Sequence, residues 1–243
     1  MDNSIYVSLS RQLTLFRDMD VTANNIANAN TTGYSAEHIL FNSYLTKDNN
    51  DGDRNSVAFA NDVATYRNTE NGSLRSTGNE LDVAIQGNGF FVVETPLGKR
   101  YTRSGNFQID GSGKLATAEG YSVLDITGQA ITLPDTATTI QIGEGGNVKV
   151  DGNDNGSIAV VQFANPQLLE RLTGKLFKSD IEGQPATSDF RVAQGMLESS
   201  NVQPVYELTH MMTLTHAVTD TAQFIAVVND LERKAANAWA AQS

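Results

Sequence analysis

The sequence predicts an α+β fold, mainly β, with terminal α-helices that form a coiled-coil arm and a central antiparallel β domain. Three observations predict it. Apolar residues recur at helical spacing near both ends, short apolar runs separated by Asn-Gly and Asp-Gly pairs fill the centre, and a polar, weakly periodic stretch precedes the centre. We therefore expect a helical assembly domain of residues 1–35 with 198–243, an extended connector of 36–74, and a β-rich domain of 75–197.

Residues 4 to about 30 carry the first helical pattern. Seven apolar positions span 21 residues in six steps, a mean spacing of 3.5, which is the coiled-coil period. The residues between them are largely polar. Gly33 then supplies a stop signal, because glycine suits the left-handed turn that ends many helices. The stripe consists of Ile5, Leu9, Leu13, Phe16, Met19, Ala23 and Ile26.

The second helical pattern runs from about residue 200 to 241. Pro204 falls in its first turn, where a missing N–H is tolerated. Nine apolar positions span 28 residues in eight steps, again a mean spacing of 3.5. We expect one stripe to cover the other, either as a helical hairpin within one chain or as a bundle of several subunits. This stripe consists of Met211, Leu214, Val218, Ala222, Ile225, Val228, Leu231, Ala235 and Trp239.

The central region contains strand-like apolar runs and turn signals. Two runs, 81–85 and 90–93, flank Asn88-Gly89, and Asn-Gly between apolar runs predicts a β-hairpin. Glycine-rich turns recur every 8 to 20 residues, which favours an antiparallel sandwich or a partly open barrel. The loop that begins at Asp151 has oxygen donors at alternate positions but ends on Gln162 where a calcium loop needs glutamate, so we interpret it as a turn.

Composition excludes several classes of function. The net charge of -11 disfavours nucleic acid and anionic membranes as partners. The chain has no cysteine, so disulfides and thiolate chemistry are excluded. No basic, apolar leader opens the sequence and no run approaches the ~20 apolar residues of a membrane span, so we expect no cleaved signal peptide and no membrane insertion.

The sequence offers little support for catalysis. His210 and His216 are six residues apart, so on a helix they point to different faces and cannot share a metal ion. No nucleophile motif or phosphate loop is present. A glycosidase-like carboxylate pair could be hidden among the 28 acidic residues. We expect no enzyme activity, no cofactor and no metal.

Several motifs resemble a known family, the flagellar basal-body rod and hook proteins. Residues 23–34 (ANNIANANTTGY) are similar to its N-terminal signature, and residues 195–202 (GMLESSNV) with Glu207 and Met211-Met212 are similar to its C-terminal motif. Residues 81–91 (LDVAIQGNGFF) and 101–107 (YTRSGNF) resemble the β domain of its rod members. The chain looks most like the proximal-rod (FlgF) type.

The resemblance implies a structural subunit of the flagellar rod that assembles axially to transmit torque. Its implied partners are other copies of itself, neighbouring rod proteins and the flagellar type III export apparatus, and its implied location is the rod that crosses the periplasm. The alternatives are a distal-rod or hook-type axial subunit, or an adaptor that docks another protein through its β domain. Residues 213–218 (TLTHAV) depart from the Arg and aromatic residue that are common in the family.

The candidate site residues form three groups. Those of the N-terminal helix are Leu9, Leu13, Phe16, Met19, Asn24, Asn25, Ile26 and Asn28; the asparagines either fix the register of a coiled coil or are solvated. A motif turn contains Thr32, Gly33 and Tyr34. Those of the C-terminal helix are Leu197, Glu198, Asn201, Val202, Met211, Leu214, Val218, Ile225 and Val228, with Asn201 expected at an N-cap.

Overall fold

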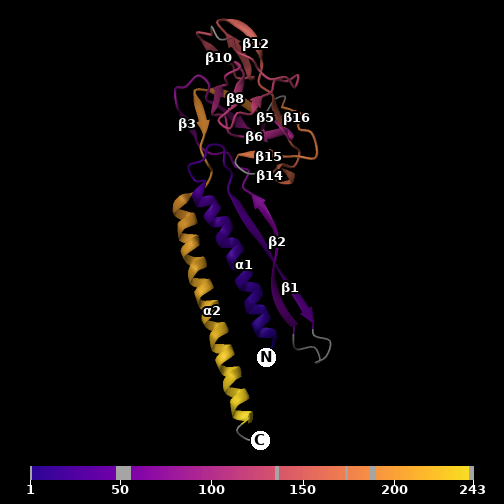
Figure 1. Cartoon of the computed structure of the whole chain (residues 1–243), viewed down its shortest axis with the longest axis vertical. Helices are drawn as coiled ribbons and strands as arrows, with labels where there is room; N and C mark the ends of the chain where they lie inside the picture. Colours follow the sequence, from indigo (N-terminus) through magenta and orange to yellow (C-terminus); the bar gives the residue numbers. More distant parts are fainter. Residues whose placement is uncertain (1, 48–55, 135–136, 173–174, 187–189, 241–243) are drawn as a thin grey trace. The chain divides into compact units, whose positions relative to one another are not determined.

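The computed structural model describes residues 2–47, 56–134, 137–172, 175–186 and 190–240. The chain divides into two compact units (Figure 1). The helical unit contains Met1–Ala27, Glu37–Arg67 and Gln203–Ser243, and the β-rich unit contains Asn28–Ala36 and Asn68–Val202. The prediction of an α+β fold that is mainly β, with antiparallel sheets, is confirmed.

Two long helices dominate the helical unit. Helix α1 spans Asp2–Ala27 and helix α2 spans Pro204–Ala240, and they lie side by side with opposite chain directions (Figure 1). The proline occupies the first position of α2, as expected. Neither helix of the described residues combines the length and apolar character that crossing a bilayer requires.

A two-stranded hairpin completes the helical unit. Strand β1 (Glu37–Lys47) pairs with β2 (Ser56–Arg67) in an antiparallel register, with an irregularity between Leu40 and Phe41. Both strands contact α1. Residues 36–74, for which the sequence predicts an extended connector, therefore contain paired strands. The expected connector also includes residues 48–55, which lie outside the residues that the structure describes.

The β-rich unit is built from short antiparallel ladders. Its largest sheet among the described residues runs in the order β14-β15-β6-β5-β9-β8-β7, and β13 pairs with both β5 and β16. Smaller sheets are β10-β11-β12, β17-β4 and β18-β3. A short helix, η1 (Pro166–Leu168), lies between β13 and β14. The strands are β3 (Leu74–Ser76), β4 (Val83–Gly87), β5 (Phe90–Thr95), β6 (Gly98–Thr102), β7 (Phe107–Ile109), β8 (Leu115–Thr117), β9 (Ser122–Val123), β10 (Ile140–Ile142), β11 (Asn147–Val150), β12 (Asn153–Ser157), β13 (Val160–Gln162), β14 (Glu170–Arg171), β15 (Leu176–Lys178), β16 (Gln184–Pro185), β17 (Phe190–Gln194) and β18 (Met196–Glu198).

A large cluster of buried apolar residues lies in this unit, with two smaller clusters beside it in the same unit. Phe91 meets Phe107 edge to face, with ring centroids 5.1 Å apart, and both side chains are buried. The core also takes in the inner residues of strands from several sheets: Val83, Ile85, Val93, Leu115, Val123, Val148, Ile158 and Val160. The core therefore holds the small sheets together as one unit.

The turn signals had mixed outcomes. Asp151-Gly152 joins β11 to β12 with positive φ at both residues, so the interpretation of this segment as a turn is confirmed. The hairpin predicted around Asn88-Gly89 is wrong, because β4 pairs with β17 while β5 pairs with β6, β9 and β13. Strands β4 and β5 are consecutive in the sequence, but they belong to different sheets.

Candidate assembly surfaces

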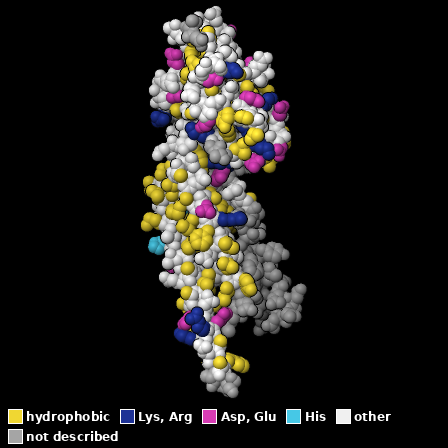
Figure 2. Space-filling model, viewed as in Figure 1, with side chains coloured by type: hydrophobic (Ala, Val, Ile, Leu, Met, Phe, Trp, Pro, Cys, Tyr) yellow, Lys and Arg dark blue, Asp and Glu magenta, His cyan; other side chains and the backbone are white. Residues whose placement is uncertain are grey.

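The N-terminal stripe lies largely on the surface of the helical unit. Leu9, Leu13 and Phe16 are 47%, 59% and 46% exposed, and Tyr6 is 62% exposed. Farther along α1, Met19 and Ile26 are half-buried. Hydrophobic side chains are visible along the helices in Figure 2. Large apolar side chains arranged along one helix face in water mark an interaction surface.

The covered side of α1 carries different residues. Ser8 and Thr22 are buried there, although both are small and polar. On α2 the buried positions are Glu207, Leu214 and Thr221, and the Thr221 hydroxyl donates to the carbonyl of Ala217 at 2.7 Å. Of the described residues of the two helices, Leu214 is the one large apolar side chain that is fully buried. Other large apolar side chains, such as Leu15 and Met19, are half-buried.

The C-terminal stripe is placed differently from the N-terminal one. Leu214 is buried, and four other candidate residues of this helix are half-buried, namely Met211, Val218, Ile225 and Val228. Next to Met211 in the sequence, His210 of α2 contacts α1: its Nε2 lies 3.2 Å from Asp18 Oδ2. This stripe thus begins against the protein's own α1.

A second set of large apolar side chains on α2 is exposed. They are spread along the helix and are, with their exposed fractions, Val205 (78%), Tyr206 (61%), Leu208 (51%), Met212 (64%), Phe224 (52%), Val227 (58%), Leu231 (59%) and Trp239 (82%). Both helices of the unit therefore keep apolar area in water.

Asn25 joins the end of α1 to strand β1. Its side chain is 1% exposed. Its Nδ2 donates to the carbonyl of Glu37 at 2.8 Å, and its Oδ1 accepts from the Glu37 N–H at 3.1 Å. The Asn25 side chain thus bonds both backbone groups of Glu37, the first residue of β1, as the backbone of an adjacent strand would. Of the other candidate asparagines, Asn24 is exposed, and Asn28 Oδ1 accepts from the Thr31 hydroxyl.

In the β-rich unit the motif residues meet around a buried ion pair. The side chains of Arg103 and Glu198 are 8% and 7% exposed. Arg103 Nε donates to Glu198 Oε2 at 2.9 Å and Nη2 donates to Oε1 at 3.2 Å. Such a two-pronged arrangement matches the planar guanidinium to the carboxylate.

The remaining donors of Arg103 are also used. Nη1 donates to the carbonyls of Gly87 and Gly89, at 2.9 and 2.7 Å, and Nη2 donates to Asn71 Oδ1 at 2.6 Å. Glu198 Oε1 accepts from the Gly72 N–H at 3.0 Å. The pair thus holds two chain segments, residues 71–72 and 87–89, and its buried charges are compensated by hydrogen bonds.

Asn201 performs a similar role beside the pair. Its Oδ1 accepts from the Ala36 N–H at 2.7 Å, and its Nδ2 donates to the carbonyls of Asn68 and Glu70, at 3.1 and 2.8 Å. The expectation that Asn201 caps α2 is wrong, because that helix begins at Pro204 and the amide is used by strand-like backbone.

The motif turn is fixed from two sides. The Gly33 N–H donates to the Glu198 carbonyl at 2.9 Å. The guanidinium of Arg171 lies 4.2 Å from the centre of the Tyr34 ring, and it also donates to the Ser35 carbonyl. Val202 is buried against Tyr34 and Ala36, Leu197 is also buried, and Thr32 is half-buried.

The sequence did not single out Arg103 or Arg171. A signal existed for Arg103, since it is a lone cation within the short run Thr102-Arg103-Ser104-Gly105 between strands. No comparable signal marks Arg171, because its role depends on β14 reaching Tyr34 from 137 residues away in the chain.

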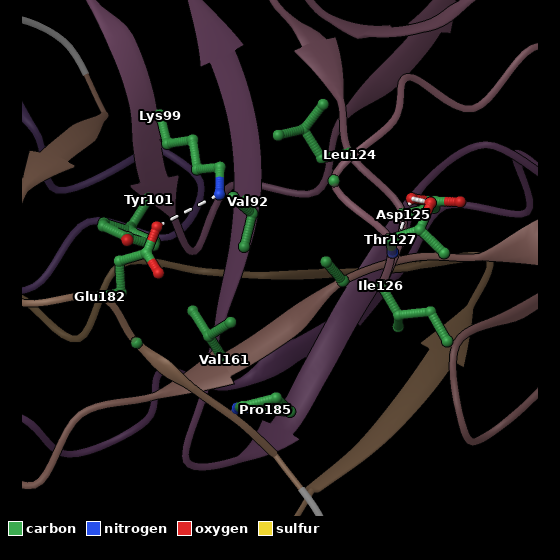
Figure 3. A pocket seen from close by; sticks show the side chains of 13 residues that line it. Val92, Lys99, Tyr101, Leu124, Asp125, Ile126, Thr127, Val161, Glu182 and Pro185 are labelled. Atoms are coloured by element: carbon green, nitrogen blue, oxygen red, sulfur yellow. Dashed lines mark hydrogen bonds and ion pairs between the residues drawn. The ribbon is translucent and has the colours of Figure 1, made fainter.

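A surface cavity of about 180 Å³ lies elsewhere in the β-rich unit (Figure 3). Val92, Leu124 and Val161 line it, and Lys99 Nζ lies 3.3 Å from Glu182 Oε1 at one side. The carboxylate of Asp125 accepts three hydrogen bonds from Thr127 and Gln129 within its own turn. Within the described residues no group of three His, Cys, Asp or Glu side chains could hold a metal ion.

Three segments of the chain match described protein families. Residues 5–34 match "Flagella basal body rod protein", residues 84–150 match "Flagellar hook protein FlgE/F/G D1 domain", and residues 193–238 match "Flagellar basal body rod FlgEFG protein C-terminal". The matches cover both helices and part of the β-rich unit.

Whole-length relatives agree with these matches. The chain is 37% identical over 237 residues to the flagellar basal-body rod protein FlgF of Caulobacter vibrioides, covering 97% of each chain. It is 36% identical to FlgF of Mesorhizobium japonicum, covering 91% of each, and 28% identical to the rod protein FlgG of Bacillus subtilis, covering 98% of this chain and 99% of the relative. This chain therefore belongs to the flagellar basal-body rod protein family, as a structural subunit of the FlgF type.

Proposed function

We propose that this rod subunit joins its neighbours through the exposed apolar faces of α1 and α2, and that it performs no chemistry. The observation that carries the proposal is the N-terminal stripe, where Leu13 and Phe16 are 59% and 46% exposed on a helix whose fully buried residues, Ser8, Thr22 and Asn25, are polar. Covering such a surface with another helix removes its apolar side chains from water, which stabilises the assembled state.

The contact is expected to be weak for one pair of helices and strong for an array. Burial of apolar area contributes roughly 25 cal/mol per Å², and association costs several kcal/mol in lost freedom and ordering. A subunit that contacts several neighbours loses its translational and rotational freedom only once. Every further contact then adds to the binding free energy without repeating that loss. This supports assembly onto a growing rod over pairing in free solution.

The partners and location follow from the same proposal. The subunit binds other copies of itself and neighbouring rod proteins in the basal body, and it reaches them through the flagellar type III export apparatus without a cleaved signal peptide. The chain has no cysteine, so no disulfide has to form on the way. The torque of the motor then passes through packed helices.

The test is a charge placed on the helical face. Leu13→Glu and Phe16→Glu should abolish swimming and the recovery of the chain in isolated basal bodies, because a buried carboxylate without a partner opposes the contact. The purified variants should keep the native circular dichroism spectrum.

The matched control is Leu97→Glu in the β-rich unit, where the replaced leucine is 81% exposed. This variant should swim normally. Normal swimming by Leu13→Glu together with loss of swimming by Leu97→Glu would instead indicate an adaptor that acts through its β-rich unit.

A further inference from the structure

Three Asn-Gly pairs of the chain can undergo the same spontaneous reaction. They are Asn71-Gly72, Asn88-Gly89 and Asn155-Gly156. Asparagine is a chemically labile residue. The backbone nitrogen of the next residue can attack its side-chain carbon and release ammonia, and glycine permits this approach because it has no Cβ. In a folded chain the rate depends on whether the two reacting groups are free to meet, and the structure distinguishes the three pairs in this respect.

The first pair is held on both sides by the buried ion pair. Asn71 Oδ1 accepts from Arg103 Nη2 at 2.6 Å, and Asn71 Nδ2 donates to the Gly87 carbonyl at 3.3 Å. The Gly72 N–H donates to Glu198 Oε1 at 3.0 Å. The attacking nitrogen and the attacked amide are therefore both fixed by hydrogen bonds that must break before they can react.

The third pair is held at one atom and by its strand. Asn155 Nδ2 donates to the Thr132 carbonyl at 2.6 Å. The asparagine lies within β12, which pairs with β11 through Asp154 on one side of it and Ser157 on the other. Both the side chain and the backbone of this pair are thus restrained.

The second pair lies between β4 and β5, and its reacting groups are not restrained in this way. Asn88 is exposed. In the part of the chain that the structure describes, neither its side-chain amide nor the Gly89 N–H takes part in a hydrogen bond. The glycine is required by packing, because a Cβ at position 89 would lie 2.7 Å from Val160 Cγ1. The fold therefore keeps the residue that permits the reaction.

We propose that Asn88 is the site at which the folded chain deamidates, and that its product weakens the Arg103–Glu198 pair. The Gly89 nitrogen gives its proton to solvent and forms a bond to Asn88 Cγ, while the side-chain nitrogen leaves as ammonia. The resulting cyclic imide is opened by water. Cleavage at Cγ gives aspartate, whereas cleavage at the former backbone carbonyl gives isoaspartate, in which the main chain runs through Cβ and Cγ.

The link to the ion pair lies in the residues on either side of Asn88. The carbonyls of Gly87 and Gly89 both accept from Arg103 Nη1, at 2.9 and 2.7 Å. Isoaspartate adds one carbon to the main chain between these two carbonyls, so they no longer meet at one nitrogen. The Asn88 carbonyl, which accepts from Gln162 Nε2 at 2.9 Å, becomes a free carboxylate. Arg103 thereby loses hydrogen bonds that compensate its burial.

The test compares the three pairs within one protein. The purified full chain is incubated at mildly alkaline pH, with and without guanidinium chloride, and is then digested with pepsin at acid pH. Mass spectrometry measures the conversion of amide to acid in each Asn-Gly peptide, and enzymatic methylation of isoaspartate identifies the product. In denaturant the three pairs should react at similar rates, because all three are then solvated Asn-Gly pairs.

In the folded chain Asn88 should convert first. Each hydrogen bond that must break slows a reaction by about three- to tenfold, so Asn155 should be about threefold slower or more and Asn71 about tenfold slower or more. Equal rates in the folded chain, or conversion of Asn155 first, would overturn the assignment. Faster conversion of Asn71 with the fold than without it would also overturn it, since Arg103 and Glu198 would then activate that pair.

The effect on the ion pair is measured on aged protein. After incubation, the urea midpoint of the β-rich unit should fall with isoaspartate content in the natural chain and stay unchanged in Asn88→Ser, which has no amide to lose. An equal fall in both would refute the link to Arg103. Fractions of the natural chain separated by charge give the same comparison without a variant, and a deamidated fraction as stable as the unmodified one would refute the link as well.

Discussion

The two units of this chain treat their apolar residues in opposite ways. In the β-rich unit, side chains such as Phe91, Val93 and Val123 are fully buried. In the helical unit, Leu13 and Phe16 face water while Ser8 and Thr22 are buried. The first unit completes its core within one chain, and the second keeps much of its apolar surface for contacts outside it.

The comparison indicates that the β-rich unit is stabilised within one chain, whereas the helical unit depends more on contacts with other subunits. A unit with a closed core can fold before assembly and remain unchanged by it. A helix pair whose large apolar side chains are mostly exposed or half-buried gains little from folding alone, because few apolar groups leave water completely when it forms. We therefore expect its order to depend on assembly. The first of the four experiments below tests this contrast between the units, and the other three test what stabilises the β-rich unit, from the largest expected effect to the smallest.

Amide hydrogen exchange on the free subunit should show the contrast most strongly. The amides of Val93 and Val123, which are paired across β5 and β9, should exchange about 1000-fold more slowly than that of Leu13, a difference of about 4 kcal/mol in opening free energy. Mass spectrometry after pepsin digestion measures it. Equal protection in both units would contradict the contrast.

Arg103→Met should unfold the β-rich unit far more readily. It leaves Glu198 buried without its cation, which costs about 3–5 kcal/mol. Urea denaturation followed by tyrosine fluorescence measures the change. Lys99→Met is the control, because its partner Glu182 is 84% exposed and such surface pairs contribute about 1 kcal/mol or less. Equal effects of the two variants would rule out a special role for the buried pair.

Gly33 and Gly78 have similar backbone dihedral angles but different surroundings. Replacing each with alanine therefore separates the cost of backbone strain from the cost of a steric clash. Gly33 and Gly78 have φ of 68° and 73°, so alanine is strained at both, by about 1–2 kcal/mol. At Gly33 the new Cβ would lie 2.6 Å from the carbonyl carbon of Arg103, whereas nothing lies within 4 Å at Gly78. Gly33→Ala should therefore cost about 2 kcal/mol more than Gly78→Ala in the same urea assay. A smaller cost at Gly33 would mean that the motif turn is not rigid.

Acid should weaken the β-rich unit slightly through two turns. The Lys114 N–H and the Ser112 hydroxyl lower the pKa of Asp110 below its usual range. Partial burial acts to raise the pKa of Asp125, but hydrogen bonds from Thr127 and Gln129 bring it below its usual value. A lowered folded pKa gives stability that is present above the unfolded pKa, about 3.9, and is lost as the pH falls through the folded pKa.

Substitution checks this pH dependence. Replacing both carboxylates (Asp110→Asn with Asp125→Asn) should flatten the fall in urea midpoint between about pH 5 and pH 2, and should lower the midpoint slightly at neutral pH. An unchanged acid profile would exclude the two turns as its source.

Local patterns in the sequence were enough to predict the helices and some turns. The spacing of Leu9, Leu13 and Phe16 predicted α1, and the segment that begins at Asp151 was interpreted as a turn, because both signals act between neighbours in the chain. The same kind of signal failed at Asn88-Gly89, where long-range partners took the edges of both strands.

A repeated turn was not recognised from the sequence. Residues 110–114 (DGSGK) and 125–129 (DITGQ) share an aspartate that accepts from the backbone N–H groups two and four positions later. Only the aspartate and the glycine are identical, so the repeat becomes evident only when the hydrogen bonds are seen.

The candidate site was predictable as a set of residues but not as an arrangement. Glu198 and Asn201 were identified, yet their partners lie on segments that no spacing connects to them. Which face of α1 would be covered was also not predictable, because the fully buried residues of α1 are the polar Ser8, Thr22 and Asn25, whereas much of the predicted apolar stripe is exposed. Whether the arms form a coiled coil with neighbours stays a prediction.

The unequal lengths of α1 and α2 bear on mechanical strength. The two helices of each copy end at different levels. In the proposed assembly, the ends of the helices in one subunit would therefore lie beside the middle of a helix in the next subunit. No flat plane of joints then crosses such a stack. Shear from a turning shaft would have to bend or break helices instead of sliding one layer of subunits over another.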